Sequence, residues 1–192
     1  MRAPAVTSLA PLAGLGLGAL AGLVYWLSLQ LWPSSVAVTL AMLASAFATR
    51  DVRLAAAGRG PARLGLLFYV LLKYNVLLAL SAAKLPFAAP PNSALCLIMI
   101  CGYGAARALL VCLAASRAAP AAEPLSYLDL SVALVIGFAP ALLLGVPGLI
   151  GLAAAVASVI ALSAAPRRAV KFTPWIAETC FYLGAQASWS YV

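Results

Sequence analysis

The chain alternates between long apolar runs and short polar segments. A helix needs about 20 apolar residues to cross the hydrocarbon core of a bilayer, and most of these runs approach that length. Their length and lack of charge predict membrane-spanning helices. A turn at Pro147-Gly148 is expected to separate the fifth and sixth runs. We therefore predict an all-α, polytopic membrane bundle of six or seven transmembrane helices, over about Ala10–Leu31, Ser35–Ala48, Leu64–Ala83, Ser93–Ala115, Tyr127–Val146, Leu149–Ala165 and Trp175–Val192.

Glycines give two of these runs a distinct character. Gly14, Gly18 and Gly22 recur at four-residue spacing, which places them on one helix face that another helix can approach closely. The pattern is either a specific dimer face, which would make the protein a homo-oligomer, or a general richness in small residues. In the fourth run, Gly102 and Gly104 are expected to loosen the packing.

Composition supports the membrane assignment and limits the chemistry. Of the 192 residues, 66% are hydrophobic and 8% are charged, whereas about a quarter are charged in soluble domains. Little length remains for a soluble part, so residues 1–192 are expected to form a single transmembrane domain. The chain has no histidine, which removes the commonest general base and most zinc sites. The cysteines lack C-x-x-C spacing and lie in apolar runs, where cysteine behaves as a small hydrophobe: Cys96, Cys101, Cys112 and Cys180.

The net charge of +8 indicates orientation rather than nucleic-acid binding, because basic residues in membrane proteins mark cytoplasmic loops. With seven spans, one side of the membrane receives nine basic residues and the other receives only Lys84. The N-terminus and the basic loops are therefore expected on the cytoplasmic face of the membrane, with the C-terminus outside. The nine residues are Arg2, Arg50, Arg53, Arg59, Arg63, Arg117, Arg167, Arg168 and Lys171.

Lys73, Arg107 and Glu178 are charged residues within predicted spans, and Asp129 lies at the start of the fifth span. A charge at the centre of a span costs about 2.5–3.5 kcal/mol on insertion scales, so these side chains should face the bundle interior or a cavity. Lys73 is either a site residue or a residue whose long side chain reaches the membrane interface. The three charges would also allow a small membrane transporter.

The segment Thr49–Gly65 is the longest polar interruption of the chain, with four arginines against one acid, Asp51. Arginine side chains bind phosphate oxygens well. The segment either receives a phosphorylated substrate from the cytoplasm, or only sets topology and contacts the headgroups of membrane lipids.

Six segments stand in a characteristic order: a span with a glycine face, an Arg-x-Gly segment leading to a lysine, an arginine-containing span, a Leu-Ser-x-x-Asp-Leu helix start and two closing motifs. In this order they resemble the cobalamin 5'-phosphate synthase family, adenosylcobinamide-GDP ribazoletransferase. The segments are Pro11–Leu31 (PLAGLGLGALAGLVYWLSLQL), Gly60–Lys73 (GPARLGLLFYVLLK), Ala105–Leu113 (AARALLVCL), Leu125–Leu130 (LSYLDL), Arg167–Thr173 (RRAVKFT) and Ala177–Leu183 (AETCFYL).

The resemblance implies a phosphoryl transfer in which α-ribazole, or its phosphate, attacks adenosylcobinamide-GDP and GMP leaves. The family's acid-rich signature, Asp-Gly-Leu-Ala-Asp-Thr-x-Asp-Gly, is reduced here to a stretch in which only Asp51 remains. By resemblance, Asp51 is the remaining ligand of a catalytic Mg²⁺ ion, and Lys73 and Glu178 line the cavity as buried partners. By the same resemblance, Arg53, Arg63 and Arg107 contact phosphates, although Arg53 is alternatively a charge that only sets topology. The resemblance also implies a location in a bacterial inner membrane. The alternatives are a catalytically inactive relative that acts as a membrane scaffold, and the small transporter.

Overall fold

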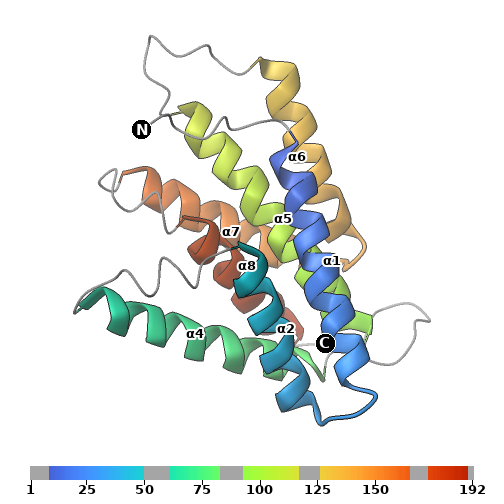
Figure 1. Ribbon diagram of the computed structural model, residues 1–192. Helices are drawn as coiled ribbons and strands as arrows, with labels where there is room; N and C mark the ends of the chain where they lie inside the picture. The colour runs from blue at the N-terminus through green and yellow to red at the C-terminus, as the bar shows by residue number, and fades with distance from the viewer. Residues whose placement is uncertain (1–8, 50–60, 83–92, 117–125, 165–172, 190–192) are drawn as a thin grey trace.

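The computed structural model describes residues 9–49, 61–82, 93–116, 126–164 and 173–189 (Figure 1). This part of the chain forms seven helices and no strand, as the all-α prediction requires. The helices are α1 (Ala10–Ser28), α2 (Ser34–Thr49), α4 (Pro61–Leu80), α5 (Ser93–Ser116), α6 (Tyr127–Leu142), α7 (Val146–Ser163) and α8 (Thr173–Trp189).

Helix α5 lies at the centre of the bundle and is its most buried helix. It packs against α1, α6 and α8, while α7 packs mainly against α8. Helix α4 lies at the edge, where it contacts α8 and α2 and only slightly α5 (Figure 1). The interior therefore forms around α5, and α4 closes one side of it.

The glycine face of α1 is a packing face within the chain. A methyl group on Gly14 would lie 2.5 Å from the backbone oxygen of Tyr103, and one on Gly18 would lie 2.6 Å from the Cα of Ile100. A methyl group on Gly22 would lie 3.2 Å from the Cα of Cys96. The Cys96 thiol also donates to the Gly22 carbonyl oxygen at 3.3 Å. The absence of side chains lets the backbones of α1 and α5 approach closely.

The turn between α6 and α7 lies earlier than predicted. Helix α6 ends at Leu142, two residues after Pro140, and the reversal is completed at Gly145. Gly145 has φ 65°, a conformation that glycine adopts without the steric cost of a side chain. Pro147 then occupies the first turn of α7, where a missing N–H costs nothing. Pro147-Gly148 is therefore the start of a helix and not the turn.

Among the described residues, two charged side chains are buried and many apolar side chains are exposed. Leucine, valine, isoleucine and phenylalanine side chains lie exposed along α1, α2, α4, α6 and α7, whereas Lys73 and Glu178 are buried. Three helices are long and apolar enough to cross a membrane: α1, α5 and α7. Helices α2 and α6 and the Leu67–Leu80 part of α4 are shorter apolar helices. This distribution is the one expected of a membrane protein.

Candidate functional site

Lys73 and Glu178, which lie far apart in the sequence, meet inside the bundle. The Lys73 Nζ lies 2.7 Å from Glu178 Oε1 and forms an ion pair between α4 and α8. Only 6% of Lys73 and 3% of Glu178 is exposed. Each charge thus has its counterion within direct contact, which is how a bundle tolerates ionised groups in apolar surroundings.

Tyr182 holds the carboxylate from a second direction. It lies four residues after Glu178, hence on the same face of α8, and its hydroxyl donates to Glu178 Oε1 at 2.8 Å. Its ring lies directly against Gly102 of α5, where a Cβ would overlap ring atoms. Gly104 likewise receives Leu15 of α1. The expectation that Gly102 and Gly104 loosen α5 is therefore wrong, because both glycines admit a neighbouring side chain and tighten the packing.

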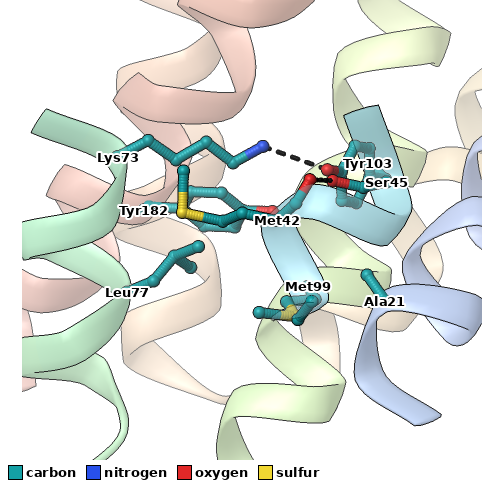
Figure 2. A pocket seen from close by; sticks show the side chains of 9 residues that line it. Ala21, Met42, Ser45, Lys73, Leu77, Met99, Tyr103 and Tyr182 are labelled. Atoms are coloured by element: carbon teal, nitrogen blue, oxygen red, sulfur yellow. Dashed lines mark hydrogen bonds between the residues drawn. The ribbon is translucent and has the colours of Figure 1, made fainter. Parts of the chain in front are cut away.

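Tyr103 of α5 is the other hydrogen-bonding partner of Lys73. The ammonium donates to the Tyr103 hydroxyl at 3.0 Å and lies 4.8 Å from the centre of its ring (Figure 2). The Tyr103 hydroxyl also shares a hydrogen bond with Ser45 of α2. Because the Ser45 hydroxyl donates to the Met42 carbonyl oxygen at 2.8 Å, the Tyr103 hydroxyl is left to donate to Ser45. The network therefore links α2, α4, α5 and α8.

Tyr69 of α4 and Trp175 of α8 form a stacked aromatic pair beside Lys73. The Lys73 Nζ lies 6.0 Å from the centre of the Tyr69 ring, one turn earlier on α4. Tyr69 in turn stacks on Trp175 of α8, with ring centres 5.4 Å apart and an angle of 21° between the planes. The electron-rich faces of these rings favour a nearby cation. This pair forms a second contact between α4 and α8 beside the ion pair.

The space around this network is dry. Apolar side chains, among them Met42, Leu77 and Met99, complete its walls (Figure 2). The remaining gap has no room for a water molecule. Because this gap excludes water and both side chains are buried, the attraction between Lys73 and Glu178 is stronger than it would be in water.

Two members of the network, Ser45 and Glu178, lie near the ends of helices that adjoin basic segments of the sequence. Ser45 lies one turn before the end of α2, and Glu178 lies five residues after the start of α8, about 7.5 Å along the helix. The sequence continues from α2 into the arginine-rich segment and enters α8 from Arg167–Thr173.

The other predicted site residues do not join this network in the part of the chain that the structure describes. Asp51 lies outside the described residues, and the side chain of Arg63, in the first turn of α4, is not described either. Arg107 lies one turn after Tyr103 on α5, and the stem of its side chain packs against Gly14. Among the described residues, Lys73 and Glu178 form the only ion pair, so Arg107 has no acidic partner there.

The residues present do not fit a Mg²⁺ site within the described ranges. A protein site for Mg²⁺ needs carboxylate oxygens that are free to coordinate it. No group of three or more acidic, cysteine or histidine side chains occurs in these ranges. Glu178 already binds Lys73 and Tyr182. The predicted ligand Asp51 lies outside them.

Sequence reasoning missed the tyrosines of the network, although the spacing contains a signal for two of them. Tyr69 precedes Lys73 by four residues, and Tyr182 follows Glu178 by four. Residues four apart share a helix face. These two tyrosines could therefore have been recognised as partners of the charges. Tyr103 has no such signal, because its partner Lys73 lies 30 residues away on another helix.

Comparison of the chain with protein-family models, with curated protein sequences and with solved structures finds no match.

Proposed function

We propose that the chain is an integral membrane protein in which the described helices form six or seven spans, with the N-terminus and the basic loops in the cytoplasm. Exposed apolar side chains on five helices support this proposal. So does the burial of Lys73 and Glu178 in the interior, because in a bilayer the apolar surface faces lipid and the charges are paired inside.

We further propose that the protein is an adenosylcobinamide-GDP ribazoletransferase. The observation that carries this proposal is the meeting of Lys73 and Glu178. They come from Gly60–Lys73 and Ala177–Leu183, two of the segments in which the chain resembles the cobalamin 5'-phosphate synthase family. A resemblance that arose only from shared apolar composition would not require these two residues to be partners.

In the proposed reaction, the ribazole hydroxyl oxygen attacks the phosphorus that is attached to cobinamide. A new P–O bond forms, the bond from this phosphorus to the oxygen of the GMP moiety breaks, and GMP leaves with that oxygen. Arg63 and Arg107 would neutralise charge on the phosphoryl oxygens, which is the main requirement of phosphoryl transfer. In this proposal Asp51, which the resemblance implies as a metal ligand, instead receives the hydroxyl proton. Lys73 and Glu178, which neutralise each other, would position α4 and α8 and not react.

A second candidate is a catalytically inactive relative that acts as a membrane scaffold. It is favoured by the closed state of the network, in which Lys73 and Glu178 bind each other and no space for water remains. The reduction of the family's acidic signature to Asp51 favours it as well.

Complementation separates these two candidates. The intact chain, expressed in a bacterial strain that lacks the synthase, is expected to restore cobalamin-dependent growth and to yield cobalamin in cell extracts. Asp51→Ala is expected to abolish this rescue while the protein still accumulates in the membrane. An intact chain that accumulates in the membrane and yields no cobalamin would overturn the transferase proposal and favour the scaffold.

A further inference from the structure

An apolar groove of about 490 Å³ separates α2 from α4. It is distinct from the dry network, although the two lie side by side. Its walls come from one face of each helix, and they comprise Thr39, Met42, Leu43, Ala46, Val70, Leu71 and Tyr74.

The walls of the groove do not suit water. Thr39 and Tyr74 supply its only side-chain hydroxyls, and the Thr39 hydroxyl already donates to the Ser35 carbonyl oxygen at 2.9 Å. A bound water needs two to four polar partners, and apolar cavities without them stay dry. The groove therefore suits a hydrocarbon chain better than it suits water.

The rim of the groove is continuous with the outward-facing apolar surface. Leu43 and Leu71 line the groove and are themselves exposed. Phe47 and Phe68 lie exposed on the same two helices. In the proposed membrane arrangement this surface faces acyl chains, so a lipid chain reaches the groove sideways without crossing polar surface.

Helix α4 packs only loosely against the other described helices. Among the described helices it contacts α8 and α2 and only slightly α5. Met42 lines both the groove and the dry network, so its side chain separates an occupant of the groove from Ser45 and Lys73. An apolar occupant would complete the packing of α4 on α2 and would leave the network dry.

We infer that this groove is a binding site for one alkyl chain of a membrane phospholipid. The inference rests on the membrane location proposed above and not on the transferase activity. In this site the alkyl chain lies between Leu43 and Ala46 of α2 and Val70 and Leu71 of α4. Met42 forms the end of the site that is nearest the network.

Photo-labelling tests the site. The intact protein is reconstituted in phosphatidylethanolamine and phosphatidylglycerol vesicles that contain a phospholipid with a diazirine in the middle of one acyl chain. After irradiation, mass spectrometry of peptides is expected to find label concentrated on the groove residues of α2 and α4. Val135 and Ile160, which are 65% and 66% exposed on α6 and α7, serve as ordinary lipid-facing positions. Label spread evenly over the groove and these positions would overturn the inference.

A variant that fills the groove provides a second test of the site. Ala46→Trp places an indole in the groove and is expected to lower labelling of Val70 and Leu71 about tenfold, which corresponds to about 1.4 kcal/mol of binding free energy. Ala157→Trp, on the exposed face of α7, is the matched control and should leave labelling unchanged. Equal labelling of the two variants would contradict the site. Labelling requires no turnover, so this result and the complementation result can fail independently.

Discussion

Lys73 and Glu178 neutralise each other at the centre of the candidate site, and two tyrosine hydroxyls complete their hydrogen bonds. A buried ion pair adds little net stability compared with apolar side chains of the same size, but leaving one partner alone is costly. The ion pair is therefore expected to fix the position of α4 relative to α8.

Substitution of one partner should destabilise the protein more than substitution of both. Lys73→Met leaves the Glu178 carboxylate buried without its counterion and is expected to lower the free energy of unfolding by about 3–5 kcal/mol. In the double variant Lys73→Met/Glu178→Gln no buried charge remains, and the glutamine oxygen still accepts from Tyr182, so the loss should be smaller than for Lys73→Met alone. Unfolding in mixed detergent micelles measures the stability of these two variants and of Glu178→Gln alone. If the loss in the double variant equals the sum of the losses in the two single variants, Lys73 and Glu178 are not coupled.

At the scale of helices, α1 and α5 are held together by backbone contact. Gly18 faces backbone atoms of α5 at distances that leave no room for a methyl group, whereas Gly16 has nothing within 4 Å. The two glycines belong to one helix and differ in their surroundings, which makes them a matched pair.

Gly18→Ala is expected to lower the free energy of unfolding by about 1–3 kcal/mol, because the backbones must move apart. Gly16→Ala should be neutral or should stabilise the helix by up to about 1 kcal/mol, because alanine has the higher helix propensity. Thermal unfolding in detergent compares the two variants. Equal effects would show that the α1–α5 contact does not depend on the absence of a side chain at position 18.

The apolar pattern was sufficient to predict an all-α chain. The glycine spacing indicated a face of α1 that another helix can approach, which was interpreted either as a dimer face or as general richness in small residues. These patterns could not indicate that the partner of this face is α5, because periodicity within one helix contains no information about its neighbours. The α6–α7 turn was misplaced because Pro147 was interpreted as a breaker, whereas proline is favoured in the first turn of a helix.

The site was predictable only as separate charges. The insertion cost of Lys73 and Glu178 indicated that both face the interior. Their contact depends on the packing of α4 against α8, which no local pattern encodes. The resemblance to the synthase family implied only that both residues line one cavity as buried partners. Four-residue spacing could have added Tyr69 and Tyr182.

At the scale of the whole molecule, the charge distribution and the apolar exterior make a prediction about topology. With seven spans, reporter fusions within residues 50–60 and 165–172 should be cytoplasmic, and a fusion after Val192 should lie outside. Fluorescent-protein and alkaline-phosphatase fusions at these three positions measure the sidedness. A cytoplasmic C-terminus together with cytoplasmic basic loops would contradict seven spans and require an even number.

The central proposal is that the protein lies in a membrane and transfers the cobinamide phosphoryl group from GMP to a ribazole hydroxyl. The most direct measurement is GMP release by the purified chain in proteoliposomes supplied with adenosylcobinamide-GDP and α-ribazole. GMP and the cobalamin product should appear in equal amounts and only when both substrates are present. Arg107→Gln is expected to lower the rate by about 10²–10³-fold, as loss of a group that stabilises transition-state charge does. No ribazole-dependent GMP release from the folded, membrane-inserted protein would contradict the account.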